Sequence, residues 1–186
     1  MGDGGLPLGA ALEELVQSGG RFERPLVRVD LGPEFSDDEI ARAFVGEGIA
    51  HARVPDAAEA ALRALQRKKI VGWLQGRMEY GPRALCHRSI LFHSRDKSAN
   101  DWLNQRMDRT EFMPFAPVTT RELASASFVG WKESDLCSRF MTMTYACTSA
   151  FEQDSPAVVH VDGTARPQVV WQEDDPLTHR LLTRWC

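Results

Sequence analysis

IVGWLQGRMEYGPRALCHRSILF, at residues 70–92, carries the clearest secondary-structure signal in the chain. Residues 70–75 form a short, mainly apolar run that ends at a glycine, which is typical of a buried strand. Residues 89–92 are strand-like again, and the loop between the two runs is rich in glycine and arginine. Four further runs have the same strand-like character, namely residues 115–119, 140–145, 158–161 and 169–171.

Helical patterns alternate with these strands. Apolar residues recur at helical spacing over residues 8–16, and Ser36 with Glu39 makes a capping-box sequence at the start of a second helix. A third helix should begin after Pro55-Asp56, and a fourth should cover residues 99–107. Several neighbouring strands have connections too short for a helical crossover, which favours a mixed sheet. The sequence therefore predicts an α/β fold in which a mixed sheet is flanked by helices.

The composition indicates one main domain with no general attraction to polyanions. The 186 residues are 43% hydrophobic, enough for a sizeable core, and the formal net charge is -4. No basic stripe suits nucleic acid, and no apolar run is long enough to cross a membrane. The four cysteines lack zinc-site spacing and no leading segment resembles a signal peptide, so we expect a reduced, cytoplasmic protein. Any anion must be bound by local arginines.

The loop of residues 76–89 is the first candidate site. It combines Arg77, Arg83 and Arg88 with two glycines and a proline. Glycine permits close approach of the backbone, and arginine offers a planar pair of donors to phosphate oxygens, so this loop suits a phosphate site. The alternative is a surface loop whose arginines are merely solvated.

Two weaker clusters follow along the chain. In residues 104–117, basic residues that include Arg106 and Arg109 precede an aromatic and proline-rich run, although a local ion pair and core aromatics explain this pattern as well. In residues 160–168, a glycine turn could present backbone amides, the Thr164 hydroxyl and the Arg166 guanidinium to one anion. A plain hairpin with Arg166 exposed is an equal alternative there.

Four motifs in order resemble one known family. GRMEYGPRAL (76–85), HRSIL (87–91), EFMPFAPV (111–118) and VVHVDGTARPQVV (158–170) resemble the carboxyl-terminal domain of O-carbamoyltransferases of the nodulation-protein-U and cephamycin/tobramycin type. The resemblance covers about residues 31–186. It implies a YrdC-like twisted mixed sheet, incomplete at the carboxyl terminus, over residues 36–186 after a linker at 21–35. GDGGLPLGAA (2–11) resembles the last glycine loop of that family's actin/sugar-kinase-like first domain, so residues 1–20 would be its end.

The resemblance also implies a chemistry. The YrdC-like domain would combine ATP and carbamoyl phosphate to give carbamoyl-adenylate, and the missing first domain would pass the carbamoyl group to a hydroxyl of a small-molecule acceptor. Arg83 and Arg166 would then be the leading catalytic cations. Arg88, Arg106, Arg109 and Thr164 would be further ligands, because fixed cations relieve the repulsion between the two phosphorylated substrates. Asp3 would bind a divalent metal, Mg or Fe, in a full-length enzyme.

The sequence departs from the family pattern in several places. A lysine and an arginine that usually precede the Pro-Phe-Ala-Pro segment are missing, with Met113 in place of the arginine. Cys86 and His87 replace a usual glycine and asparagine, and a later Asn-Thr-Ser-Phe-Asn segment is absent. We therefore expect no complete transfer reaction from this chain alone. A non-catalytic nucleotide- or anion-binding module and an inactive truncated remnant remain as alternatives.

Overall fold

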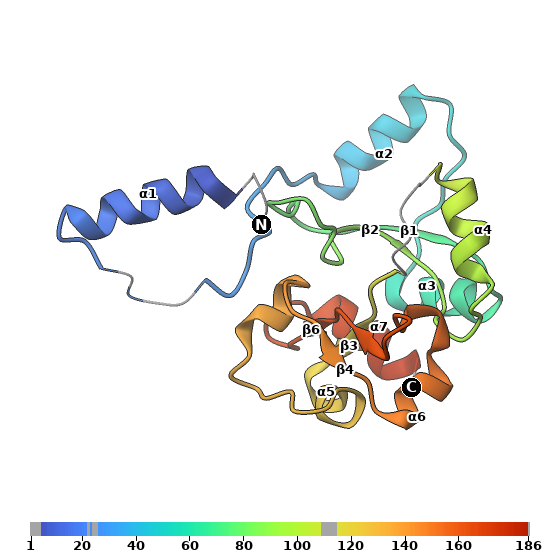
Figure 1. Cartoon of the computed structure of the whole chain (residues 1–186). Helices are drawn as coiled ribbons and strands as arrows, with labels where there is room; N and C mark the ends of the chain where they lie inside the picture. Colours follow the sequence, from blue (N-terminus) through green and yellow to red (C-terminus); the bar gives the residue numbers. More distant parts are fainter. Residues whose placement is uncertain (1–4, 22, 24–25, 109–114, 186) are drawn as a thin grey trace. The chain divides into compact units, whose positions relative to one another are not determined.

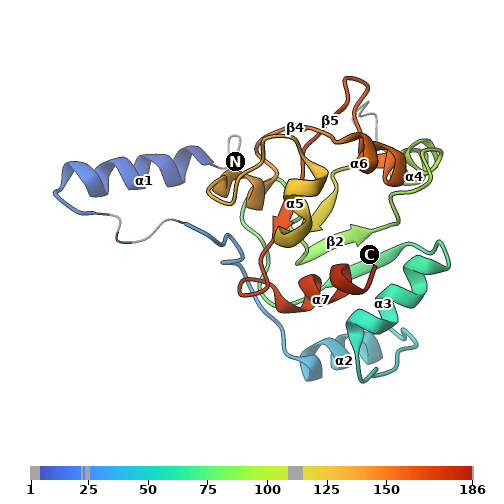
Figure 2. The same ribbon diagram turned by 90° about the horizontal axis from the view of Figure 1, so that it is seen from below.

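The computed structural model describes residues 5–21, 23, 26–108 and 115–185. The chain divides into two compact units, one formed by residues 1–57 and 72–90 and the other by residues 58–71 and 91–186. Figure 1 labels the helices and most strands of both units, and Figure 2 labels β5. The division expected from the resemblance, at residues 20 and 35, stays a prediction.

The first unit contains two helices and the loop of residues 76–89. Helix α1 (Gly5–Gln17) buries none of its residues, whereas α2 (Asp37–Gly46) begins with the predicted capping box. The Ser36 hydroxyl accepts the Glu39 N–H at 3.3 Å, and the Ser36 N–H donates to the Glu39 carboxylate at 2.8 Å, so both exposed amides are satisfied.

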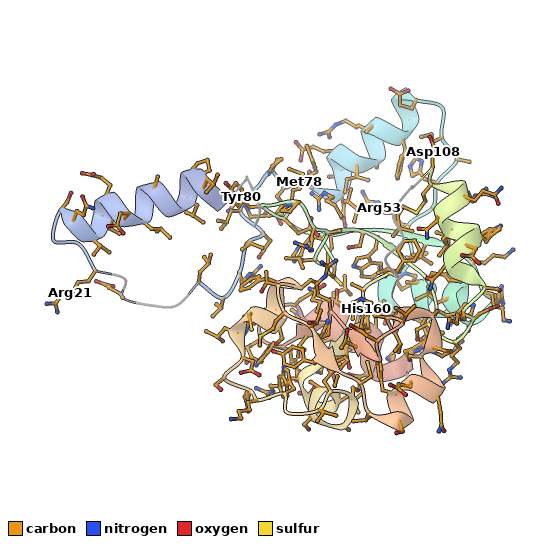
Figure 3. All side chains as sticks on the ribbon, in the orientation of Figure 1. Arg21, Arg53, Met78, Tyr80, Asp108 and His160 are labelled. Atoms are coloured by element: carbon orange, nitrogen blue, oxygen red, sulfur yellow. The ribbon has the colours of Figure 1, made fainter. Side chains whose placement is uncertain are left out.

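Strands β1 (Val71–Leu74) and β2 (Arg88–Leu91) pair in a two-stranded sheet and lie at the positions predicted for them. The loop between them is attached to the segment of residues 29–33 by backbone hydrogen bonds. The Met78 carbonyl accepts the Gly32 N–H at 2.9 Å, and the Tyr80 N–H donates to the Val29 carbonyl at 2.7 Å. Figure 3 labels Met78 and Tyr80 on this loop. The loop is therefore supported from outside as well as by its own strands.

The second unit holds most of the regular structure. Its helices are α3 (Ala57–Gln66), α4 (Ala99–Arg106), α5 (Arg121–Ser127), α6 (Ser149–Asp154) and α7 (Pro176–Trp185), with 3-10 turns η2 (Leu136–Phe140) and η3 (Pro156–Val158). Figure 2, viewed from below, shows α3 and α7 side by side, as does Figure 1. Arg184 of α7 donates to Glu59 of α3 at 2.9 Å, an ion pair that joins the two helices.

Two small sheets organise the core of the second unit. Strands β3 (Val118–Thr120) and β6 (Gln168–Val170) are parallel, and β4 (Tyr145–Ala146) and β5 (Thr164–Ala165) are antiparallel. The core consists of aromatic and small apolar side chains from these strands, from α5 and from the segments next to them, namely Ala124, Phe128, Trp131, Tyr145, Cys147, Ala165, Val169 and Trp171. The predicted α/β class with a mixed strand arrangement is confirmed, and the strands within the described residues close no barrel.

Three expected strands differ from the structure. In the run 115–119, the strand covers only Val118–Thr120, and in 140–145 a 3-10 turn ends at Phe140 before β4 begins at Tyr145. Residues 158–161 form no strand, because Pro156 favours a tight turn with its fixed φ and the His160 N–H closes the next turn on the Thr164 carbonyl at 2.7 Å. The short helices α5 and α6 were missed, since six or seven residues carry little periodic signal.

Among the helices in the described ranges, none combines the length and the apolar character that a bilayer crossing requires.

Replacing Ser138 by alanine should destabilise the second unit. The fully buried Ser138 hydroxyl accepts the Trp131 indole N–H at 3.1 Å and donates to the Asp135 carbonyl at 2.7 Å. Ser138→Ala leaves a buried indole N–H unsatisfied, so the free energy of unfolding should fall by about 1–3 kcal/mol in urea titrations. Ser134→Ala, at an exposed position nearby, is the matched control and should change the unfolding free energy by less than about 0.5 kcal/mol. Equal effects of the two variants would contradict this role of the hydroxyl.

Candidate functional site

A buried carboxylate organises the loop of residues 76–89. Glu79 is 8% exposed, and its Oε1 accepts three backbone N–H groups, from Leu85 at 2.7 Å, His87 at 2.7 Å and Arg88 at 2.9 Å. Burial by itself raises the pKa of the Glu79 carboxyl, but the hydrogen bonds from the Arg88 and Leu85 amides outweigh burial and lower the pKa below its ordinary value. The charged carboxylate therefore gathers the second half of the loop around one oxygen atom.

The loop also needs unusual backbone conformations. Gly76 and Gly81 have φ of 46° and 109°, which glycine adopts without strain. Cys86 has φ of 67° and is buried, and its N–H donates to the Ser89 hydroxyl at 2.9 Å. A left-handed conformation at this position explains why a glycine is suited to it, and the cysteine accepts local strain instead.

Arg88 braces the loop through its guanidinium group. Its Nη1 donates to the Gln75 carbonyl at 2.8 Å and to the His87 carbonyl at 3.0 Å. Its Nη2 donates to the Gly76 carbonyl at 3.0 Å and to the Pro33 carbonyl at 3.3 Å. The guanidinium thus connects both ends of the loop to the neighbouring segment, and four of its contacts are to backbone oxygens of this chain.

Arg83 belongs to the same loop but differs from Arg88 in its contacts. The residue is half-buried, and in the described part of the chain no hydrogen bond or ion pair involves its guanidinium group. Because arginine remains charged at any physiological pH, five N–H donors there stay available for an anion. Of the loop arginines, Arg83 therefore has the geometry that best suits a ligand contact.

In the turn of residues 160–168, two of the donors expected to bind an anion are hydrogen-bonded to a carboxylate of the turn itself. The Thr164 N–H and hydroxyl donate to Asp162 Oδ1 at 3.0 and 2.8 Å, and the hydroxyl lies 3.0 Å from His160 Nδ1. Figure 3 labels His160 among the side chains of this region. The hydrogen bonds from Thr164 lower the pKa of the Asp162 carboxyl below its ordinary value. The amide and the hydroxyl expected to bind an anion are thus bonded to Asp162, while Arg166 follows β5 as a half-buried residue.

The remaining predicted ligands are Arg106, Arg109 and Asp3. Arg106 is exposed on α4, where its guanidinium carbon lies 5.6 Å from the centre of the Trp102 ring. Arg109 and Asp3 lie outside the described residues. Across the ranges that the structure describes, no three His, Cys, Asp or Glu side chains are grouped as a metal site would need. The described residues therefore offer no set of ligands for the metal expected at Asp3.

Sequence reasoning overlooked Glu79, which carries most of the loop's hydrogen bonding. The signal was present, because Glu79 is the single acidic residue in a loop with three arginines. An isolated acid in such a loop suggests an ion pair first. Its actual partners are backbone amides, which sequence patterns do not reveal.

Comparison with known proteins assigns most of the chain to one family. Residues 62–186 match the family described as Carbamoyltransferase C-terminus. An uncharacterised protein of Methanocaldococcus jannaschii is 31% identical over 100% of this chain and 31% of its own length. Nodulation protein NolNO of Sinorhizobium fredii is 38% identical over 90% of this chain and 25% of its own length.

A named carbamoyltransferase is also similar. The 3'-hydroxymethylcephem-O-carbamoyltransferase of Amycolatopsis lactamdurans is 38% identical over 66% of this chain and 22% of its own length. The chain therefore spans a third or less of the length of these curated relatives. Because the family match covers two thirds of its residues, the chain belongs to the carbamoyltransferase C-terminus family.

Proposed function

We propose that this chain is the carbamoyl-activating part of an O-carbamoyltransferase. In this proposal it binds ATP and carbamoyl phosphate, forms carbamoyl-adenylate, and supplies it for transfer to a hydroxyl of a small-molecule acceptor by a further domain. Membership of the carbamoyltransferase C-terminus family supports the class of reaction. The observation that carries the proposal within the chain is Arg83, whose guanidinium stands on a braced loop with its donors available.

The balance of the proposed reaction defines what the residues must do. Water releases phosphate from carbamoyl phosphate, and an oxygen of the resulting carbamate bonds to the α-phosphorus of ATP as pyrophosphate leaves. Both substrates are polyanions, so their approach is opposed by charge repulsion. Fixed cations whose positions do not have to reorganise lower the barrier most, because they stabilise the charge that moves to the leaving group.

Each arginine has a separate role in this proposal. Arg83 and Arg166 contact the phosphate groups and the carbamoyl moiety, with Arg106 and Arg109 as additional phosphate ligands. Arg88 acts mainly as a positioning residue, because its guanidinium already bonds the backbone of the loop that presents Arg83. Thr164 contributes its hydroxyl only when a substrate oxygen replaces Asp162 as the acceptor of that hydroxyl's proton.

Removing either leading arginine should slow activation. In a version extended by the segments that its relatives carry, Arg83→Ala and Arg166→Ala should each reduce carbamoyl-phosphate-dependent release of pyrophosphate from ATP about a hundredfold. Arg42→Ala and Arg67→Ala alter exposed arginines outside both loops and serve as matched controls with unchanged rates. Full activity in both test variants would rule out the assigned roles.

A binding module without chemistry is the second candidate. The observation behind it is that Asp162 accepts both Thr164 donors, so the turn of residues 160–168 presents neither of these two donors to a reacting phosphate. Calorimetry separates it from the first candidate, because saturable ATP binding without pyrophosphate release in the extended version would indicate the module. An inactive remnant would show neither ATP binding nor pyrophosphate release.

Replacing Glu79 by glutamine tests the positioning of the loop. The variant should lower the free energy of unfolding at about pH 7 by about 2 kcal/mol, because a neutral amide accepts the three N–H groups more weakly. A folded-state pKa below the ordinary 4.5 means that the charged carboxylate stabilises the fold above about that pH. This stabilisation is lost as the pH falls through the lowered pKa, so the difference between the wild type and Glu79→Gln should narrow in acid.

The matched control for this substitution is Glu34→Gln, which changes an exposed carboxyl in the same unit. Urea titrations from about pH 7 to about pH 3 measure the effect, with hydrogen exchange of the Leu85, His87 and Arg88 amides as a local readout. A gap between wild type and Glu79→Gln that stays constant with pH would refute this account.

A further inference from the structure

A cavity of about 560 Å³ lies within the second unit. We call it the His93 cavity. Its wall includes Lys68 at the end of α3, the segment of residues 93–97 that follows β2, and Trp185 at the end of α7. Its volume falls within the range of small-molecule pockets, roughly 300–1,000 Å³. Neither the loop of residues 76–89 nor the turn of residues 160–168 contributes to its lining.

An unsatisfied imidazole stands at the wall of this cavity. His93 is 7% exposed, and within the described residues its buried Nε2 has no hydrogen-bond partner. Leaving such a group unbonded costs about 1–3 kcal/mol, so a native fold normally supplies it with a partner. Burial, followed by the positive charge of Lys68, lowers the pKa of His93. A neutral imidazole can still donate one hydrogen bond to an anion.

The charged groups around His93 are mainly positive. Lys68, Arg95 and Lys97 line the cavity together with one acid, Asp96. The Asp96 carboxylate is bonded to the Ser98 N–H at 3.1 Å and the Ser98 hydroxyl at 2.6 Å, and Arg95 pairs with Asp154 at 3.3 Å. Over the described ranges no ion pair involves the Lys68 or Lys97 ammonium group. Two cations thus remain available beside the imidazole.

Lys68 occupies a backbone position that normally selects glycine. It ends α3 with φ of 57°, its N–H donates to the Leu65 carbonyl at 2.8 Å, and the Lys69 N–H donates to the Ala64 carbonyl at 3.0 Å. This pair of bonds is the Schellman arrangement, in which the left-handed residue is usually glycine. A lysine there costs about 1 kcal/mol relative to glycine. The chain thus tolerates strain at the residue whose ammonium borders the cavity.

We propose that the His93 cavity binds a small phosphate-bearing molecule with a flat ring. Lys68 and Lys97 neutralise the phosphate, His93 Nε2 donates to a phosphate oxygen, and the Trp185 indole packs against the ring. Indole faces provide large, flat apolar contacts, and lysine is a common phosphate ligand. This binding site is independent of the carbamoyl chemistry proposed above and needs none of its residues.

The test uses calorimetry of the whole chain with AMP, inorganic phosphate and adenosine as probes. AMP should bind saturably, and more tightly than either inorganic phosphate or adenosine. Lys68→Gly and Lys97→Ala should each weaken AMP binding about tenfold, the loss expected for one charged contact. Lys68→Gly should also raise the melting temperature, because it relieves the left-handed lysine while removing the ligand contact. Saturation with AMP should shift the ¹⁵N resonance of His93 Nε2 in the unsubstituted chain.

Two controls separate this site from the proposed function. Lys69→Ala removes an exposed lysine that does not line the cavity and should leave AMP binding unchanged. Arg83→Ala and Arg166→Ala should also leave it unchanged, whatever their effect on carbamoyl activation. The proposal is overturned if calorimetry detects no saturable binding at AMP concentrations up to about 10 mM, because any dissociation constant would then be weaker than a specific site gives. It is overturned equally if Lys68→Gly leaves AMP binding unchanged, or if Lys69→Ala weakens AMP binding as much as Lys68→Gly does. It is also overturned if the two arginine variants weaken AMP binding and the two lysine variants of the cavity do not.

Discussion

The Glu79 carboxylate and the three backbone amides that it accepts are the constraint on which the arginine loop depends. A loop with positive φ at Gly76, Gly81 and Cys86 cannot satisfy its own amides through a regular ladder. One buried oxygen supplies what a strand partner would otherwise provide, and it does so with a full negative charge. The arginine side chains of the loop can then extend without forming an ion pair with Glu79, because the Glu79 carboxylate is already hydrogen-bonded to the backbone.

The arginines of this loop illustrate two uses of one side chain. Arg88 turns its guanidinium to carbonyl oxygens and so acts as part of the scaffold, while Arg83 keeps its donors available. Arg83 stands in the GPRAL motif and Arg88 in the HRSIL motif of the sequence, and the motif letters alone do not separate the two roles. The difference arises from geometry, since the carbonyls of Gln75, Gly76 and Pro33 all lie within reach of position 88.

The second unit shows a related division between core and surface. Tyr145 of β4 and aromatic residues in the segments that follow α5 and β6 make much of the core, and the short strands leave turns whose polar groups must be satisfied locally. Asp162 does this for Thr164, and Ser138 does it for Trp131. His93 is different, because its Nε2 is buried without a partner in the described part of the chain, beside a cavity bordered by lysines. The unsatisfied His93 Nε2 and the lysines beside it are therefore the features of this unit from which a ligand site is inferred.

Local patterns of the sequence were sufficient for the α/β class, the capping box of α2, the start of α3 after Asp56, the two strands around the arginine loop and the family itself. These features depend on interactions within a few residues of one another, or on motif letters in a fixed order. The short strands and helices between residues 121 and 161 were not predicted correctly, because elements of so few residues show little periodicity and Pro156 redirects the chain. Only the tertiary structure decided the role of Glu79, the inward turn of Arg88 and the capture of Thr164 by Asp162. Only the tertiary structure also shows that Lys68, His93 and Trp185 line one cavity. These three residues come from segments that are far apart in sequence, and no local sequence pattern encodes which distant segments come together.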